Sequence, residues 1–419
     1  MTILYNRVID NIIPKRFSET PVLLLQGPRS VGKSTTLKII SQKYNKNVLD
    51  LDDPETIKLL EIIGSDIIPQ NYPVFIDEYQ KNSNILNIIK SRLNLKTDYQ
   101  QFLISGSTSF DAMPSNSQNL TGRIDKIDIL PLSQLEISQK RHNNNIEKII
   151  NNFPKFLEKK FISKTEYSQY LKMLTIGGFP LSLTQKTISS RNRWFKNYIN
   201  YTINRDIRDM ANIRQTDEMI SLLNKLAKAS GQILNIKNIS KDSKMNESTT
   251  KNYITLLEKV FLINRLPISK AINTNKLMKR PKIHFVDTGI ASSILGINEL
   301  NINDFNPKII TNIGGLFESF AINEIIRLAS VCDDVKNIGY WRTLDGKEID
   351  LILETWNNKV FAFEIKSGVN IKSSDFNSIK YYKKLAGDSF GGGILFYTGK
   401  ISGTVEKDIA LFPLDTLWH

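Results

Sequence analysis

A glycine-bounded turn ending in lysine and serine is the feature that most constrains how this chain folds. The turn reads Gly27-Pro28-Arg29-Ser30-Val31-Gly32-Lys33-Ser34; it follows an apolar run and opens a stretch with helical periodicity. The N–H groups of such a turn surround a phosphate, and the helix N-terminus adds partial positive charge. The pattern predicts a strand, a phosphate-binding loop and a helix, with phosphate contacts from Gly27, Pro28, Arg29, Ser30, Val31, Gly32, Lys33, Ser34 and Thr35.

An acidic pair supplies the second half of this predicted site. Asp77 and Glu78 end the apolar strand 74–76. With Lys33 upstream to reach the β- and γ-phosphates and Ser34 to hold Mg²⁺, Asp77 is expected to bind the same ion, directly or through water. Glu78 is then the base that orients the attacking water. On its own, such an acidic pair could equally be the exposed end of a strand. Together with the phosphate-binding loop, it predicts binding and hydrolysis of Mg-ATP. The strand that carries the pair is expected to neighbour the strand that precedes the loop.

Two further groups are candidates for sensing or stabilising the γ-phosphate. Ser105 and Ser107 follow the apolar run 102–104, where a small polar group can lie near the nucleotide, although a plain turn after a strand has the same composition. Arg123 follows Gly122 and could stabilise charge on the leaving phosphate from a neighbouring subunit. Its alternative role is to pair with a surface acid.

Short apolar runs alternate with helical stretches over the first 140 residues, at 22–25, 47–51, 74–77, 102–104 and 127–130. This order predicts an α/β fold with a parallel sheet covered by helices. From 143 onward the chain reads as helical, and a long helix is expected through Trp194, Tyr198, Tyr201, Ile203 and Ile207. After 289 a helix at 316–328 precedes strands at 349–353, 360–365 and 393–397, which predicts a separate C-terminal α/β unit.

Composition narrows the class of protein. Hydrophobic residues make up 41% and charged residues 23% of the chain, as in globular domains. No apolar run approaches the length of a membrane span, so we expect a cytoplasmic protein without a membrane partner. A single cysteine, Cys332, excludes an internal disulfide, and three scattered histidines give no zinc-ligand spacing. The formal net charge of +14 favours a polyanionic partner, although a solvated basic surface would give the same value.

Residues 236–260 have the shape of a helix, a short turn and a second helix. Asn246-Glu247-Ser248 is a capping stretch before the second helix, which carries Tyr253, Leu256 and Leu257 on one face. The other face offers small polar and basic groups suited to base edges and phosphates: Thr249, Thr250, Lys251 and Asn252. The same segment would equally serve as a packing module.

Carboxylates gather in the C-terminal strands. Glu364 and Lys366 are two apart on one predicted strand and share a face, and Asp350 on the adjacent strand can join them. This D…E-x-K pattern is that of metal-dependent nucleases, with Asp350 and Glu364 on Mg²⁺, Lys366 positioning water and Glu318 as an added helical ligand. The alternative is an inactive fold that keeps an ion-pair network. Many such folds carry a Gln-x-x-x-Tyr element in the helix that follows, and this sequence has none near 379–382.

The order of these motifs resembles a large prokaryotic family of AAA-like P-loop ATPases. The matching residues are 27–34, 75–80, 105–107, 122–123, 130–136, 177–180, 205–207, 285–289, and 348–350 with 364–366. The resemblance implies an AAA-like ATPase core, a winged-helix segment and a C-terminal domain similar to restriction-endonuclease-like (PD-(D/E)xK) folds. We accordingly expect a P-loop core at 1–142, a helical lid or linker at 143–215, a winged helix at 216–300 and a nuclease-like domain at 301–419.

Two functions are consistent with these patterns. The first is an ATP-driven switch or motor acting on nucleic acid, most plausibly DNA, with a metal-dependent nuclease domain and self-association into homo-oligomers. The second is an ATP-dependent regulatory or scaffold protein whose C-terminal modules bind proteins and cut nothing. ATP and Mg²⁺ are the ligands expected in both.

Overall fold

The computed structural model describes residues 4–82, 84–110, 120–139, 144–211, 216–272, 277–302 and 307–419. Its internal contacts separate two units. Unit 1 comprises Met1–Pro131 with Lys259–Leu262, and unit 2 comprises Leu132–Glu258 with Ile263–His419. Among the described residues, no helix combines the length and the apolar character needed to cross a membrane.

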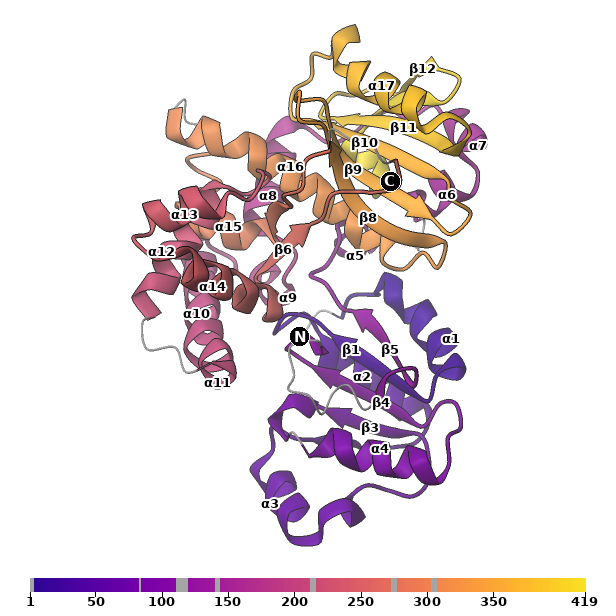
Figure 1. Cartoon of the computed structure of the whole chain (residues 1–419), viewed down its shortest axis with the longest axis vertical. Helices are drawn as coiled ribbons and strands as arrows, with labels where there is room; N and C mark the ends of the chain where they lie inside the picture. The colour runs from indigo at the N-terminus through magenta and orange to yellow at the C-terminus, as the bar shows by residue number, and fades with distance from the viewer. Residues whose placement is uncertain are drawn as a thin grey trace. The chain divides into compact units, whose positions relative to one another are not determined.

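A five-stranded, all-parallel sheet forms the centre of unit 1 (Figure 1). Its strands are β1 (Val22–Gln26), β2 (Val48–Asp50), β3 (Val74–Asp77), β4 (Phe102–Gly106) and β5 (Ile124–Asp128), in the order β2-β3-β4-β1-β5. The expected parallel α/β core is therefore confirmed. One detail of the expectation is wrong: β4 lies between β1 and β3, so the acidic pair is one strand removed from the loop's strand.

Helices cover both faces of this sheet. They are η1 (Val8–Asn11), α1 (Ile12–Glu19), α2 (Lys33–Lys43), α3 (Pro54–Ile63), η2 (Gly64–Ile67), η3 (Tyr79–Lys81) and α4 (Ile85–Leu95). On one face, Phe17 of α1 and Tyr44 after α2 make ring contacts with Phe75. On the other, α4 buries a row of aliphatic side chains against Ile76 and Ile104. Alternate strand residues thus face two apolar layers, which explains the unbroken apolar runs of the inner strands.

Strand β5 starts three residues before the apolar run expected at 127–130. Its register pairs Val22 with Ile124, so the strand includes Asp125 and Lys126. Because β5 is the edge strand and only Ile127 is buried along it, hydrophobicity marks its end but not its beginning.

Unit 2 begins with helices: α5 (Gln134–Ile137), α6 (Asn145–Asn151), α7 (Phe153–Leu157), α8 (Tyr167–Ile176), α9 (Pro180–Leu183), α10 (Ile188–Tyr201), η6 (Thr202–Ile207), α11 (Arg208–Met210), α12 (Thr216–Lys228), α13 (Ile236–Asp242), α14 (Glu247–Lys259) and α15 (Thr288–Leu295). The long helix expected through Ile207 is present as α10, but it passes into a π-helical turn over η6. Trp194 and Tyr198 stack on each other along its inner face.

Helices α12, α13 and α14 precede two antiparallel strands, β6 (Ile263–Leu266) and β7 (Lys282–Phe285). Asn246 caps α14 by accepting a hydrogen bond from the Thr249 N–H at 2.7 Å, as the capping stretch predicted. One part of the sequence interpretation is wrong. Thr250 is not on the outer face: its side chain is buried, and its hydroxyl donates to the Asn246 carbonyl. Lys251 and Asn252 are exposed.

The chain ends in a mixed six-stranded sheet of order β12-β13-β11-β10-β9-β8, which the long helix α16 (Pro307–Ala329) precedes. The elements after α16 are β8 (Val335–Arg342), β9 (Glu348–Thr355), β10 (Val360–Lys366), η7 (Ser373–Phe376), α17 (Asn377–Ala386), η8 (Gly387–Ser389), β11 (Phe390–Tyr397), β12 (Gly403–Glu406), β13 (Ile409–Pro413) and η9 (Leu414–Leu417). Helix α17 packs Ile379 and Tyr382 on one face. Phe153 and Phe156 of α7 contact Phe361 and Phe412 on the sheet.

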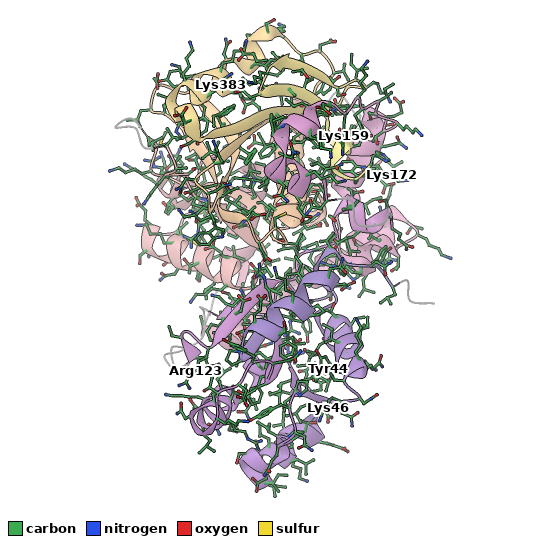
Figure 2. The ribbon with its side chains drawn as sticks, turned by 90° about the vertical axis from the view of Figure 1, so that its right-hand side faces the viewer. Tyr44, Lys46, Arg123, Lys159, Lys172 and Lys383 are labelled. Atoms are coloured by element: carbon green, nitrogen blue, oxygen red, sulfur yellow. The ribbon has the colours of Figure 1, made fainter. Side chains whose placement is uncertain are left out.

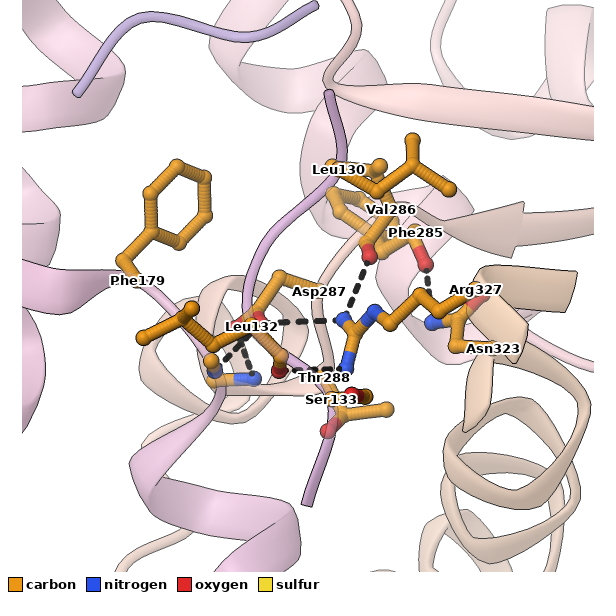
Figure 3. Close-up of polar contacts among 12 residues, drawn as sticks. Leu130, Leu132, Ser133, Phe179, Phe285, Val286, Asp287, Thr288, Asn323 and Arg327 are labelled. Atoms are coloured by element: carbon orange, nitrogen blue, oxygen red, sulfur yellow. Dashed lines mark hydrogen bonds and ion pairs between the residues drawn. The ribbon is translucent and has the colours of Figure 1, made fainter. Parts of the chain in front are cut away.

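Three of the sequence motifs meet in a buried polar junction of unit 2 (Figure 3). The Asp287 carboxylate accepts from the Gly178 N–H at 2.6 Å and lies 3.4 Å from the Arg327 guanidinium. Arg327 also donates to the carbonyls of Leu132 and Val286, each at 3.1 Å. The motifs at 130–136, 177–180 and 285–289 therefore include a structural centre in which one buried arginine and one buried aspartate satisfy backbone groups from three segments.

Gly178 is a position at which this junction has no room for a side chain. A Cβ added there would lie 2.2 Å from the Leu132 carbonyl oxygen. We predict that Gly178→Ala destabilises the protein by about 1–3 kcal/mol through overpacking. Gly314, exposed in α16 with no atom within 4 Å of an added Cβ, is the matched control, and Gly314→Ala should be neutral or slightly stabilising. Thermal unfolding followed by circular dichroism compares Gly178→Ala with Gly314→Ala. Equal unfolding midpoints would contradict the claim that a side chain at Gly178 overpacks the junction.

Candidate functional site

The loop before α2 has the geometry of a phosphate cradle. Gly27, Ser30 and Gly32 have φ values of 152°, 61° and 102°, so the backbone turns back on itself over six residues. The buried Lys33 ammonium lies inside this turn and donates to the carbonyls of Gly27 and Pro28 at 3.0 and 2.7 Å. Ser34 and Thr35, at the exposed start of α2, leave the first turn of the helix accessible to a ligand.

Two contacts fix the loop within unit 1. Gly27 lies so close to the segment after β5 that an added Cβ would be 2.1 Å from the Ile129 carbonyl oxygen. The Arg7 guanidinium donates to the Val31 carbonyl at 3.0 Å and to the Leu130 carbonyl at 2.6 Å. The N-terminal segment, the loop and the residues after β5 are thus held as one piece.

The acidic pair lies at the same edge of the sheet as the loop. The registers pair Ile76 with Ile104 across β3 and β4, and Leu25 with Ser105 across β4 and β1. Asp77 therefore lies level with the end of β1, with Ser105 of the central strand between them. The Ser105 hydroxyl donates to the Asp77 carboxylate, which also accepts from the Glu78 N–H at 3.0 Å.

Glu78 adopts a left-handed backbone conformation with φ 53° and ψ 44°. Such a conformation costs a non-glycine residue about 1–3 kcal/mol and is found mainly where a side chain must be aimed. The Glu78 carboxylate accepts a hydrogen bond from the Gln80 amide and, at 3.3 Å, from the Ser107 hydroxyl. Gln80 also donates to Ser107 at 3.0 Å. Ser107, the candidate sensor, is thus in direct contact with the candidate base.

Arg123 lies at the opposite end of the strands from the loop. It immediately precedes β5, its carbonyl accepts from the Val22 N–H at the start of β1, and its guanidinium donates to the Asn94 amide oxygen at 2.7 Å (Figure 2). The partner is an amide rather than the surface acid that the sequence offered as an alternative. A role on a nucleotide of a neighbouring subunit stays a prediction.

The residues of this edge fit a magnesium–triphosphate. A turned backbone, a buried lysine and a helix N-terminus suit the phosphate oxygens, and carboxylate and hydroxyl oxygens suit Mg²⁺. Gly27, Lys33 and Ser34 would hold the phosphates, and Ser34 with Asp77 would hold the ion. All of these side chains belong to unit 1.

The C-terminal carboxylates surround an unforeseen lysine. Lys282 of β7 is 2% exposed, and its ammonium lies 2.7 Å from Glu318 and 3.3 Å from Asp350. It also forms an ion pair with Glu348. The second Asp350 oxygen accepts from the Ile365 N–H at 2.9 Å, and Glu364 accepts from the Asp350 N–H at 3.3 Å. Asp350 therefore lies beside Glu364, and together with Glu318 and Glu348 it surrounds a protein cation that the sequence did not predict.

The charges in this cluster act strongly on one another. Burial and the Asp350 carboxylate raise the pKa of Glu318 to about 8, against the opposing effect of Lys282. The same two causes raise the pKa of Glu364 well above its usual range, while Lys366 acts in the opposite direction. Burial alone would lower the pKa of Lys282, but Asp350, Glu318 and Glu348 together raise it.

This donor set does not fit a divalent cation as it stands. An ion bound by Glu318 and Asp350 would have to share their oxygens with the Lys282 ammonium, and like charges at such distances repel. Within the described ranges, no group of three or more histidine, cysteine, aspartate or glutamate side chains is placed to hold a metal ion. The assignment of Asp350, Glu364 and Glu318 as metal ligands, and of Lys366 as a catalytic group, stays a prediction.

Four residues of these sites were missed from the sequence: Arg7, Gln80, Lys282 and Glu348. Gln80 and Glu348 lie within motifs that carry the family resemblance. Their positions in sequence, two residues from Glu78 and Asp350, could have indicated that they belong to the sites. Lys282 and His284 alternate with Ile283 and Phe285, which is typical of a strand with one solvated face. Nothing in the sequence around Arg7 marks it.

Comparison with known families assigns the first unit. Residues 19–138 match the model described as "AAA domain". Residues 167–301 and 313–417 match two domains of unknown function, DUF8612 and DUF4143. Since the AAA match covers the parallel sheet and the phosphate loop, this part of the chain is an AAA-like P-loop ATPase fold.

Individual relatives are distant. The uncharacterized proteins Rv2008c of Mycobacterium tuberculosis and Mb2031c of Mycobacterium bovis are each 22% identical over 346 residues, which is 83% of this chain and 70% of theirs. Among solved structures, the Walker-type ATPase PABY2304 of Pyrococcus abyssi has a TM-score of 0.42 and 13% identity over 70% of this chain and 96% of its own. The RuvB Holliday junction branch migration motor of Thermotoga maritima has a TM-score of 0.29 and 16% identity over 61% of this chain and 89% of its own. Similarities this low carry no argument about function.

Proposed function

We propose that this protein binds Mg-ATP at Gly27–Ser34 and hydrolyses it, using the reaction to switch its action on nucleic acid. The observation that supports ATP binding is the buried Lys33 ammonium, which lies within a backbone turn at the sheet edge that also carries Asp77 and Glu78. An AAA-like core, a basic chain and a helix–turn–helix segment with exposed lysines support the wider proposal.

Different side chains of this site have different roles in ATP binding and hydrolysis. Lys33 moves from the loop carbonyls to the outer phosphates, and the loop N–H groups hold the inner ones. Ser34 and Asp77, the latter oriented by Ser105, would hold Mg²⁺, which when bound would neutralise phosphate charge. Glu78 would accept the proton of the attacking water. Gln80 and Ser107 both donate to one oxygen of the Glu78 carboxylate, Oε2, so Oε1 can take up this proton while both contacts are kept.

Nucleic acid contact is assigned to the helix–turn–helix of unit 2. Lys237 and Lys241 are one turn apart on α13, Lys244 lies in the turn, and Lys251 is near the start of α14; all four side chains are exposed. Some other lysines of the chain are less available for contacts with nucleic acid because they already have acidic partners. Lys383, labelled in Figure 2, is already paired with Glu406 and Asp408. Four exposed lysines in a single helical hairpin are suited to contact the phosphate backbone of DNA.

One observation favours the second candidate function. Since Lys282 neutralises the C-terminal carboxylates, that domain has the features of a binding module more than those of a nuclease. A regulatory or scaffold ATPase whose C-terminal modules bind protein partners would keep the same ATP site. Nucleic acid binding separates the two candidates.

Hydrolysis is tested at Glu78. We predict that Glu78→Gln lowers the rate of phosphate release from ATP by about 10²–10⁴-fold, the usual contribution of a general base, without abolishing ATP binding. Glu61→Gln, which removes an exposed acid from α3, is the control and should keep the wild-type rate. Equal rates for wild type and Glu78→Gln in a malachite-green assay would show that Glu78 is not the base.

Nucleic acid binding is tested with alanine at Lys241, Lys244 and Lys251 together. For duplex DNA followed by fluorescence anisotropy, the slope of log affinity against log salt should become shallower by about 2–3, since each lost phosphate contact contributes about 0.9. Alanine at Lys58, Lys172 and Lys384, which are exposed on α3, α8 and α17, removes the same charge and should leave the slope nearly unchanged. No binding by wild type, or equal losses in both triple variants, would favour the scaffold function.

A further inference from the structure

The position of Lys282 leads to an inference that is independent of the ATP site. We propose that the Lys282 ammonium occupies the place of a divalent cation among Glu318, Glu348 and Asp350. The C-terminal domain is then neutralised by its own chain, holds no catalytic metal and cuts no nucleic acid. Removing the lysine side chain opens a latent site for Mg²⁺ or Mn²⁺.

The first observation that supports this proposal is the set of contacts made by the Lys282 ammonium. It reaches one oxygen from each of three carboxylates, on two different elements: Glu318 on α16, and Glu348 and Asp350 on β9. Glu348 and Asp350 are two apart on a strand and so face the same side. Carboxylate oxygens are the ligands that hard divalent ions prefer, but with the ammonium among them these three carboxylates are not placed as a metal site in the described structure. Here an ammonium group provides the positive charge.

The lysine is held in this place by its surroundings. His284, two residues along β7, lies 2.9 Å from the Ser319 hydroxyl, next to Glu318 on α16. Lys282 is paired with Leu266 across the β6–β7 ladder, and its ammonium lies 5.5 Å from the centre of the Tyr340 ring. The β6–β7 pairing at its backbone and the three carboxylates at its ammonium therefore both hold Lys282 in the cluster.

Charge explains why the lysine excludes a metal. Two cations among the same three carboxylates would repel each other around a lysine that is itself buried. The Asp350 oxygen that does not contact Lys282 already accepts from the Ile365 N–H. Conversely, breaking a buried pair by removing one partner leaves uncompensated charge. Without Lys282, Glu318 and Asp350 would lose the ammonium that binds them, whereas Glu348 would keep its ion pair with Arg342. Glu318 and Asp350 would therefore gain most from a divalent cation.

The test measures Mn²⁺ binding to the full-length, nucleotide-free protein by electron paramagnetic resonance. Wild type is expected to show no Mn²⁺ binding that depends on Asp350. Lys282→Ala should bind Mn²⁺ at least tenfold more tightly than wild type, and Lys282→Ala with Asp350→Asn should return to the wild-type level. Lys282→Met is the matched control: it removes the charge but fills the same space, so it should lose stability and gain much less Mn²⁺ affinity.

If Lys282→Ala does not fold, the wild-type protein compared with Asp350→Asn still tests the proposal. Its Mn²⁺ binding and its cleavage of plasmid DNA in Mn²⁺ should be the same as those of Asp350→Asn. Cleavage or Mn²⁺ binding that wild type shows and Asp350→Asn lacks would overturn the proposal. A folded Lys282→Ala protein with no gain in Mn²⁺ affinity would overturn the latent site.

Discussion

The close contact between Gly27 and the Ile129 carbonyl is the constraint on which the ATP site depends. Only a residue without a side chain allows the loop to lie against the segment after β5. Arg7 then binds the carbonyls of Val31 and Leu130 on the two sides of that contact. With the loop fixed in this way, α2 starts at Lys33, and the lysine, the helix N-terminus and the carboxyl ends of β3 and β4 share one edge.

Each unit contains a buried lysine, and their partners give them opposite roles. Lys33 donates to carbonyl oxygens of a turn that carries no full negative charge, so a phosphate is a stronger partner than those it has. Lys282 is surrounded by three carboxylates, and any incoming anion would compete with them. The first lysine is suited to binding a ligand and the second to holding the fold together. The same residue type thus has two functions, decided by the charge of its neighbours.

Much of unit 1 could be predicted from the sequence because its inner strands are buried on both faces and read as continuous apolar runs. The edge strand β5 was placed too late because only Ile127 of its five residues is buried. The loop residues and Asp77 were found from local motifs, whereas the order of the strands, with β4 between β1 and β3, depends on long-range pairing that no local pattern records.

The C-terminal cluster shows where local patterns fail. The proximity of Asp350 and Glu364 is consistent with strand periodicity, but Glu318 is on helix α16. Lys282 lies 68 residues before Asp350, on a strand whose polar face appeared to be solvated. That face is buried against α16, so its polar groups have protein partners instead of water. Likewise, no role for the motif residues Gly178 and Asp287 could be predicted from the sequence. The structure shows that the Asp287 carboxylate accepts from the Gly178 N–H and from Arg327.

The most direct test of the central claim is calorimetric titration of the full-length protein with ATP and Mg²⁺, beside Lys33→Met. The account predicts one site per chain for wild type and an affinity about 10–100-fold weaker for Lys33→Met, because a charge-assisted hydrogen bond to phosphate contributes about 1.5–3 kcal/mol. Absence of binding by wild type, or equal affinities for the two proteins, would contradict the assignment of this loop as the nucleotide site.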